Sequence, residues 1–155
     1  MDHFHKRFSQ TSFEKFKKYE VALLKNISIE NHTLQKNDDP FGIDILIYNG
    51  TGKPVGGLEA ECHSKYWTDE DFPFRTVHFL FRKKKYINRD HFYIMMNKGA
   101  TNALLLPFSK LKKYKPREIS NSVVKRELMY DIPIFECVWG WKAINKYLNK
   151  HFRKI

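Results

Sequence analysis

The chain has 155 residues, of which 28 are Lys or Arg and 17 are Asp or Glu, so its formal net charge at pH 7 is +11. A chain of this length buries about two-thirds of its unfolded surface, so one globular domain needs no disulfide or structural metal. Hydrophobic residues make up 42% of the sequence and aromatic residues 15%, which excludes a disordered chain.

The pattern of apolar residues and cysteines excludes two further classes of protein. No apolar run approaches the roughly 18 residues of a membrane span, and the first residues, MDHFHKRFSQ, lack the apolar block of a secretory signal. We therefore expect a cytoplasmic protein, found in the host cytoplasm if a phage or virus encodes it. Cys62 and Cys137 lie far apart without a CxxC spacing, so we expect both to be reduced and neither to bind zinc.

Positive charge is concentrated in the second half of the chain. Residues 1–74 contain 9 basic and 12 acidic side chains, whereas residues 75–155 contain 19 basic and 5 acidic ones. This favours a polyanionic partner, because each Lys or Arg that neutralises a phosphate releases condensed counterions. The alternative is a basic face that is merely solvated. We favour nucleic acid. The residues expected to contact it are Arg82, Lys83, Lys84, Lys85, Lys112, Lys113 and Lys115.

The first predicted element is a helix. Thr11-Ser12-Phe13-Glu14 has the sequence of a capping box with Thr11 as the N-cap, and the helix is expected to end near Asn26. Glu20 falls on its apolar face. A carboxylate there is costly unless it is paired, so Glu20 either forms a salt bridge or serves a metal site. The apolar stripe consists of Phe13, Phe16, Leu23, Leu24 and Ile27.

Two strands joined by a tight turn are predicted next. Residues 41–48 form an apolar run interrupted by Asp44, residues 49–54 have turn composition, and residues 55–63 return as a second strand. Alternation along the return strand separates its side chains into two faces. One face carries Glu59, Glu61 and His63, and the other carries Leu58, Ala60 and Cys62. His63 would assist as a base or ligand, although a hydrogen-bonded structural histidine is the simpler interpretation.

The second half of the chain is predicted to contain further strands and a terminal helix. The predicted strands span residues 75–81, 91–97, 102–106 and 131–138, with a short basic helix or loop over 108–117 and an amphipathic helix from Trp139 onward. We place the strand 75–81 in the same sheet as the acidic strands. These elements predict a single α+β domain with a central mixed or antiparallel sheet, flanked by an N-terminal and a C-terminal helix.

The order of a helix with Glu20, a strand with Asp44, a tight hairpin and a strand with Glu59-Ala60-Glu61 resembles the PD-(D/E)XK nuclease superfamily, whose fold is restriction-endonuclease-like. The resemblance implies that Asp44 and Glu59 bind a divalent metal ion, with the carbonyl of Ala60 as a further ligand and Glu20 as the supporting acid. A looser similarity to small phage and mobile-element endonucleases covers residues 12–106 and rests on Glu59-x-Glu61, Trp67, Phe72-Pro73-Phe74, Arg82-Lys83 and Phe92-Tyr93. Residues 107–155 would then be a basic extension of one nuclease-like domain, 1–155.

Two positions depart from the superfamily pattern. Gly42-Ile43-Asp44 stands in place of a literal Pro-Asp, and Glu61 occupies the position of the motif lysine. Two compensations are open: Glu61 orients a water at the metal, or a lysine from the cluster at 83–85 supplies the lost cation. Lys83 and Lys85 are favoured over Lys84 for this second role, because strand alternation would turn both to one face.

Carboxylate and carbonyl ligands favour Mg²⁺ or Mn²⁺ over zinc. Metal-assisted hydrolysis needs no protein nucleophile, which agrees with the lack of a P-loop or a Ser-His-Asp signature. We therefore expect a metal-dependent DNA endonuclease that acts through Asp44, Glu59, Glu61 and Glu20 on double-stranded DNA, in which case cutting both strands favours a homodimer. The alternative is a non-catalytic DNA- or RNA-binding protein on the same fold, whose acids serve only structure.

Overall fold

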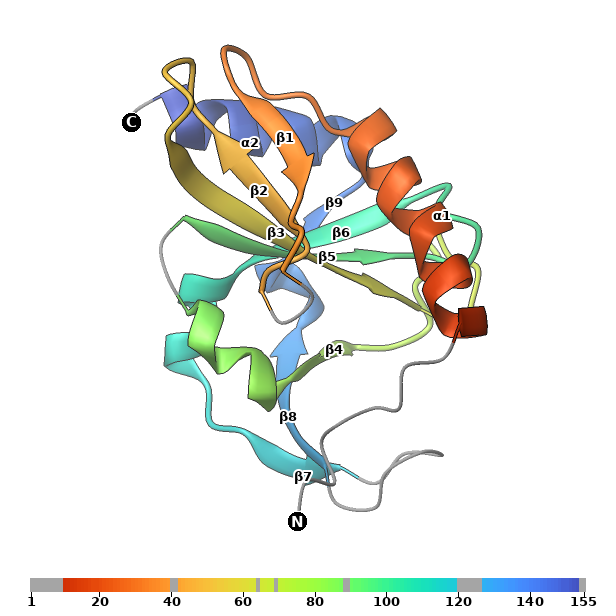
Figure 1. Ribbon diagram of the computed structural model, residues 1–155. Helices are drawn as coiled ribbons and strands as arrows, with labels where there is room; N and C mark the ends of the chain where they lie inside the picture. The colour runs from red at the N-terminus through yellow and green to blue at the C-terminus, as the bar shows by residue number, and fades with distance from the viewer. Residues whose placement is uncertain are drawn as a thin grey trace.

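The fold of the chain is known from a computed structural model with two β-sheets and a helix near each end (Figure 1). The structure describes residues 10–39, 42–63, 65–68, 70–87, 90–119 and 127–153, without the side chains of residues 10–16, Phe81 and Arg82. The predicted single α+β domain with a central mixed sheet is confirmed.

The larger sheet has six strands. In spatial order they are β1 (Thr33–Lys36), β2 (Ile45–Tyr48), β3 (Pro54–Cys62), β5 (His91–Met96), β6 (Ala103–Pro107) and β9 (Val138–Trp139). Strands β3 and β5 are parallel, and the other neighbouring pairs are antiparallel. The smaller sheet contains β4 (Thr76–Leu80), β8 (Glu127–Pro133) and β7 (Arg117–Ile119), all antiparallel.

Helices α1 (Gln10–Asn26) and α2 (Trp141–Arg153) contribute to the core on one face of the larger sheet. In α2 the buried residues recur every fourth position, which places them on one side of the helix. They pack in one cluster with Leu23 of α1 and Leu58 of β3. The buried residues of α2 are Ile144, Leu148 and Phe152.

A second core lies on the opposite face of the larger sheet. Tyr93 of β5 and Leu106 of β6 pack there with Phe79 of β4 and Tyr130 of β8, so the two sheets face each other across this cluster. Two short 3-10 helices border it and contact each other, η1 (Phe81–Tyr86) after β4 and η2 (Phe108–Lys113) after β6. Because side chains alternate along β3, this second face is the one that carries Glu59.

Several sequence predictions of local structure are confirmed. The first helix ends at Asn26, and the 49–54 segment contains the turn between β2 and β3. The terminal helix is also present, although it begins at Trp141 instead of Trp139, because Val138 and Trp139 form β9. Leu58 and Ala60 are buried on the face opposite Glu59, as alternation predicts. Cys62 and Cys137 form no disulfide. Neither described helix is long and apolar enough to cross a membrane.

Other predictions were wrong. The strand at 75–81 belongs to the smaller sheet as β4, because its alternation shows a strand but not its partner. The late strand lies at 127–133 instead of 131–138, and a 3-10 turn follows Pro133, which has no N–H to continue a ladder. Strand β1 was missed, since it is short and mostly exposed. Helix α1 already includes Gln10, so Thr11 is not its N-cap, and the side chains of the predicted capping box lie outside the described residues.

Candidate functional site

Asp44 and Glu59 lie opposite each other at the end of the β2–β3 pair. Ile45 pairs with Leu58 in the antiparallel register, so Asp44, one residue before β2, comes to the level of Glu59. Residues opposite each other in such a pair project to the same face of the sheet. The Oδ2 atom of Asp44 also accepts a hydrogen bond, 2.8 Å long, from the N–H of Ala60. The two predicted metal ligands are therefore neighbours in the fold.

Lys83 brings an ammonium group to this carboxylate pair. Its Nζ donates a hydrogen bond to Oε1 of Glu59 and forms an ion pair with it, although 24 residues separate the two in sequence. Lys83 comes from the 3-10 helix η1, in which side chains three residues apart share a side, so Lys83 and Tyr86 point together. Lys84 and Lys85 are exposed, and the Nζ of Lys85 lies 5.0 Å from the centre of the Tyr86 ring. Of the lysines in this cluster, Lys83 reaches the acids.

The carboxylate pair is under electrostatic strain. Burial, reinforced by the charge of Glu59, raises the pKa of Asp44 to about 7, even though the Ala60 hydrogen bond and Lys83 oppose the shift. Burial also raises the pKa of Glu59 in spite of its contact with Lys83. The Oε2 atom of Glu59 is buried and has no hydrogen-bond partner in the part of the chain that the structure describes. Two carboxylates thus share one ammonium group.

Sequence reasoning missed Tyr86 and His91, which border the site. Burial and the charges of Glu59 and Asp44 raise the pKa of the Tyr86 phenol to about 12, so it stays neutral. The His91 ring lies 6.0 Å from the Tyr86 ring, and its pKa is lowered by burial. His91 pairs with Gly57 in the register of β3 and β5, two residues before the level of Glu59. The 3-10 spacing from Lys83 to Tyr86 is the signal that would have pointed to Tyr86.

Glu61 and Glu20 lie at the margins of the pair. Glu61 is half-buried, two residues after Glu59 on β3, and its charge raises the pKa of Glu59. Glu20 is buried on α1, and its Oε2 atom lies 3.3 Å from the Nζ atom of Lys36 at the end of β1. Its charge contributes the smallest part of the raised pKa of Asp44. The direct partner of Glu20 is therefore a lysine of the sheet edge.

His63 is engaged in local structure just beyond β3. Its Nδ1 atom accepts a hydrogen bond from the backbone N–H of Lys65, 3.2 Å away. Its ring lies 5.8 Å from the rings of both Phe72 and Phe74. These contacts agree with a structural histidine.

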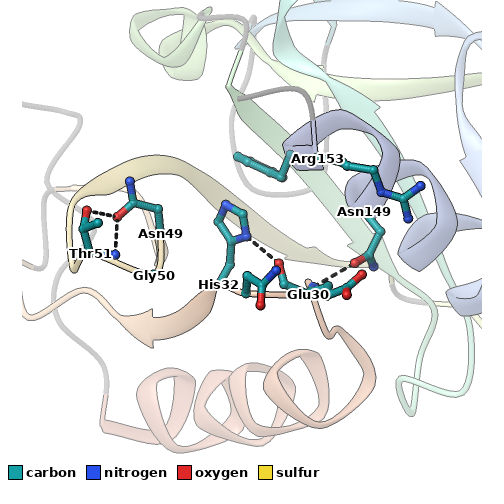
Figure 2. A pocket seen from close by; sticks show the side chains of 9 residues that line it. Glu30, His32, Asn49, Gly50, Thr51, Asn149 and Arg153 are labelled. Carbon is teal, nitrogen blue, oxygen red and sulfur yellow. Dashed lines mark hydrogen bonds between the residues drawn. The ribbon is translucent and has the colours of Figure 1, made fainter.

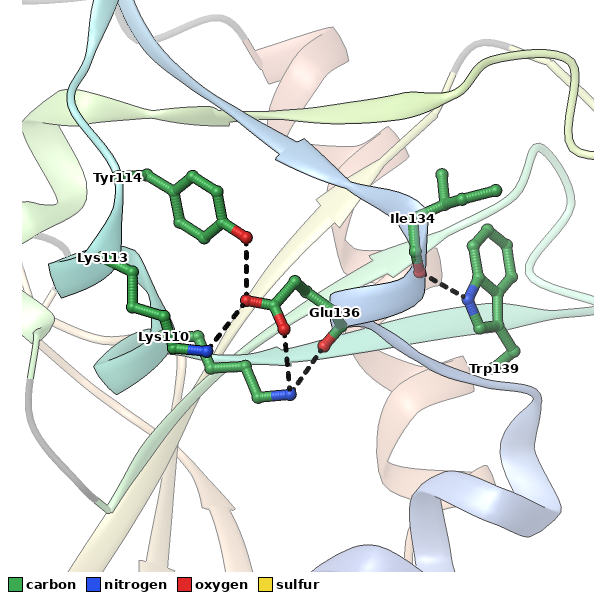
Figure 3. A network of polar contacts seen from close by, with 6 residues as sticks. All are labelled: Lys110, Lys113, Tyr114, Ile134, Glu136 and Trp139. Atoms are coloured by element: carbon green, nitrogen blue, oxygen red, sulfur yellow. Dashed lines mark hydrogen bonds and ion pairs between the residues drawn. The ribbon is translucent and has the colours of Figure 1, made fainter.

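The predicted basic residues come from two segments that the fold brings together. The helices η1 and η2 contact each other, although about 30 residues separate their lysines in the sequence. Lys112 and Lys115 are exposed. Lys113 is exposed as well, and its Nζ atom belongs to an ion-pair network around the buried Glu136 (Figure 3). The side chain of Arg82 lies outside the described residues.

Glu136 is surrounded by donors. The hydroxyl of Tyr114 donates a hydrogen bond of 2.9 Å to its Oε2 atom, and the Nζ atoms of Lys113 and Lys110 lie 3.3 Å and 3.8 Å from its two oxygens. The Tyr114 hydrogen bond and the two lysines lower the pKa of Glu136. This carboxylate anchors η2 to the segment after β8.

The acidic pair has the composition of a magnesium or manganese site. Among the described residues, no three His, Cys, Asp or Glu side chains gather closely enough to hold a metal ion by themselves. Mg²⁺ is commonly bound by only one or two carboxylates, with water and substrate phosphates completing its shell. The buried Oε2 atom of Glu59 and the neighbouring Asp44 fit this need. The N–H and C=O of a strand residue point to the same side, so the Ala60 carbonyl lies on the same edge of β3 as the N–H that Asp44 accepts from.

A separate pocket lies at the far end of β2 and β3, near the end of α2 (Figure 2). Its volume is about 280 Å³. Its polar side chains serve the fold: Asn49 accepts hydrogen bonds within its own turn, and Asn149 bonds the backbone of Ser28 and Glu30. None of the predicted site residues lines this pocket.

Comparisons with known proteins identify no family for this chain. No protein-family profile matches it, and no curated protein is significantly similar to it in sequence. Among solved structures, it is similar to that of D212, a nuclease from a fusselovirus, with 14% sequence identity, 92% of each chain covered and a TM-score of 0.47. This similarity is too low to carry a functional conclusion, which has to come from the residues of the chain itself.

Proposed function

We propose that this protein is a divalent-metal-dependent nuclease that hydrolyses phosphodiester bonds at Asp44, Glu59 and Lys83. The carrying observation is the pair of opposed carboxylates, Glu59 buried and Asp44 half-buried, with the Lys83 ammonium on Glu59 and one buried Glu59 oxygen that has no partner among the described residues. A pair of this kind is costly if its role is only structural, because burial and mutual repulsion both disfavour its charge. A divalent cation would offset both.

The donor atoms of the site suit Mg²⁺ or Mn²⁺. Asp44, the Oε2 atom of Glu59 and the carbonyl of Ala60 would hold the ion, since all are hard oxygen ligands. When bound, such an ion neutralises charge on the phosphate and lowers the pKa of water. Glu61 would orient the attacking water by accepting one of its hydrogen bonds.

Lys83 would take the role of the lysine that the sequence motif lacks. Glu61 occupies the usual position on β3, and Lys83 supplies an ammonium to the same acids from η1. We assign to Lys83 the stabilisation of negative charge that develops on the phosphate during hydrolysis. Its ion pair with Glu59 holds the ammonium in place before substrate arrives.

The substrate proposed for the site is DNA. Lys84, Lys112 and Lys115 are exposed on or beside the adjacent helices η1 and η2, where they would neutralise backbone phosphates. Glu20 would support the site without contacting the metal ion. It forms an ion pair with Lys36, and its negative charge acts on Asp44. Cleavage of both strands of a duplex would require two copies of the chain.

A plasmid-nicking assay tests the proposal. Supercoiled plasmid is incubated with the wild-type protein, Glu59→Gln or Glu136→Gln, each in Mg²⁺, Mn²⁺ or EDTA. The wild type and Glu136→Gln should nick the plasmid with either metal and not in EDTA, whereas Glu59→Gln should bind DNA without nicking it. Binding without metal-dependent nicking by the wild type would identify a non-catalytic nucleic-acid-binding protein instead. Equal nicking by Glu59→Gln would place the active site elsewhere.

A further inference from the structure

Two exposed aromatic side chains gather where β3 and β5 end. Because these strands are parallel, the chain leaves both at the same edge of the sheet. Backbone hydrogen bonds join the two exits, from His63 N to Met96 O and from Lys98 N to Lys65 O. The aromatic residues beside these exits, Tyr66 and Phe74, are 68% and 44% exposed.

Each exposed ring has a lysine ammonium near it. The Nζ atom of Lys98 lies 5.4 Å from the centre of the Tyr66 ring, and the Nζ atom of Lys65 lies 5.4 Å from the centre of the Phe74 ring. Exposed apolar surface bordered by charge is a common mark of a binding site. Aromatic faces flanked by lysines match a nucleic acid strand, whose bases stack and whose phosphates pair with cations.

Both exposed rings pack against neighbouring residues of the fold. Phe74 packs edge-on against Phe72, which in turn contacts the buried Trp67 and also Trp139. Tyr66 lies against Gly99, where a Cβ would be only 3.2 Å from Cε1 of the tyrosine ring and where φ is +88°. The nearby acid Asp71 is turned to its own loop, where it accepts a hydrogen bond from Thr68 N. The exposed rings are therefore positioned in advance.

The proposed active site lies between these rings and the basic helices. Glu59 is three residues before the end of β3, about 10 Å along the strand from the edge where Tyr66 follows. The helices η1 and η2 border the other end of β5, since η1 precedes this strand and η2 follows its antiparallel neighbour β6. A DNA strand passing Glu59 would thus have lysines of η1 and η2 on one side and the aromatic rings on the other.

We propose that Tyr66 and Phe74 form a stacking platform for unpaired bases, with Lys65 and Lys98 on the adjoining phosphates. The preferred substrate is then DNA with a junction between duplex and single strand. The duplex lies on η1 and η2, the single strand lies on the platform, and the scissile bond lies at Asp44 and Glu59. This inference rests on the proposed nuclease function for the position of the cut, but the platform itself is tested by binding alone.

Fluorescence anisotropy in EDTA separates the platform from catalysis. A forked duplex with an unpaired arm of about ten nucleotides is compared with a blunt duplex of the same length. The wild type should bind the fork about tenfold or more tightly than the blunt duplex. The double variant Tyr66→Ala, Phe74→Ala should lose this preference and keep its affinity for the blunt duplex. Tyr66→Phe should retain the preference, because it removes only the hydroxyl.

Phe135 provides a matched control, since it is also an exposed aromatic residue, 78% exposed, but lies in the turn after β8. Phe135→Ala should leave the preference for the fork unchanged, and 2-aminopurine in the unpaired arm should be quenched by the wild type and not by the double variant. Equal affinity of the wild type for fork and blunt duplex, or an unchanged preference in the double variant, would overturn the platform. A preference for the fork without any cleavage would support the platform and reject the nuclease.

Discussion

Glu59 and Glu136 are two buried glutamates with opposite surroundings. They are only 2% and 8% exposed, respectively. Glu136 accepts a hydrogen bond from a tyrosine hydroxyl and forms ion pairs with two lysines, and its pKa is lowered. Glu59 shares one lysine with a second carboxylate, keeps one buried oxygen without a described partner, and has a raised pKa. Burial alone therefore does not separate these two acids, whereas the balance of their donors does.

The largest expected difference between the two glutamates is in catalysis. Glu59→Gln should lower the single-turnover rate of DNA cleavage in Mg²⁺ by about a thousandfold, because it removes a charged metal ligand at the reacting phosphate. Its DNA affinity should stay equal or rise, since repulsion of the phosphate is reduced. Glu136→Gln should cleave at the wild-type rate. Similar rates for both variants would remove the distinction between the two sites.

The contact of Lys83 with Glu59 sharpens the comparison further. Lys83→Met should lower the cleavage rate at saturating DNA about a hundredfold with little change in affinity, because the ammonium acts mainly in the transition state. Lys84→Met is the control from the same helix, and it should lower the slope of log affinity against log salt by about one. Loss of affinity without loss of rate in Lys83→Met would make Lys83 one more phosphate contact.

Stability should depend on pH in opposite directions at the two sites. A raised carboxyl pKa means that the native state holds its proton more tightly than the unfolded state, so this contribution to stability is lost as the pH rises towards 7. Without metal, Asp44→Asn should raise the melting temperature at pH 8 by about 5 °C, and the gain should vanish near pH 4. The asparagine keeps an acceptor for the Ala60 N–H.

Glu136→Gln should behave in the reverse way in the same measurement. The lowered pKa of Glu136 means that its contribution is present near neutral pH and is lost as the pH falls through its native pKa. The variant should therefore melt below the wild type at pH 8 and approach it in acid. The same sign of pH dependence for both variants would contradict the contrast between the two environments.

The smallest expected effect is at Glu20. Glu20→Gln should change the cleavage rate less than tenfold and lower the free energy of unfolding by about 1 kcal/mol, because it breaks an ion pair with the partly exposed Lys36. Lys36→Met should cause a similar loss of stability in thermal unfolding. A tenfold or larger loss of rate in Glu20→Gln, with unchanged stability, would instead make Glu20 part of the metal site.

Local patterns in the sequence were sufficient for half of the candidate site. Alternation along residues 55–63 and the turn at 49–54 predict that the strands carrying Asp44 and Glu59 pair, and a β-bulge between Ile47 and Tyr48 then sets the register that brings the two acids to one level. The burial of Glu20 likewise follows from its place in the helical stripe. Such features depend only on residues close in sequence.

The other half of the site depends on tertiary structure. Strand alternation predicts Lys83 or Lys85 at the acids, but residues 81–86 form the 3-10 helix η1, so this premise was wrong although Lys83 does contact Glu59. Lys83 reaches Glu59 because β4 joins a second sheet and η1 then turns back to the first. The same turn brings Tyr86 to the acids, and the His91 ring lies 6.0 Å from the Tyr86 ring. Lys113 lies in a basic segment of the kind that contacts nucleic acid. In the fold, however, it forms an ion pair with Glu136. Sequence alone does not distinguish these two uses of a lysine.

Anomalous scattering from crystals of the protein soaked in Mn²⁺ tests the central claim most directly. The account predicts one strong peak between the carboxylates of Asp44 and Glu59, beside the carbonyl of Ala60, and no such peak in crystals of Glu59→Gln. Occupied manganese sites only elsewhere on the protein, or none at saturating Mn²⁺ with the Glu59–Lys83 ion pair unchanged, would contradict it.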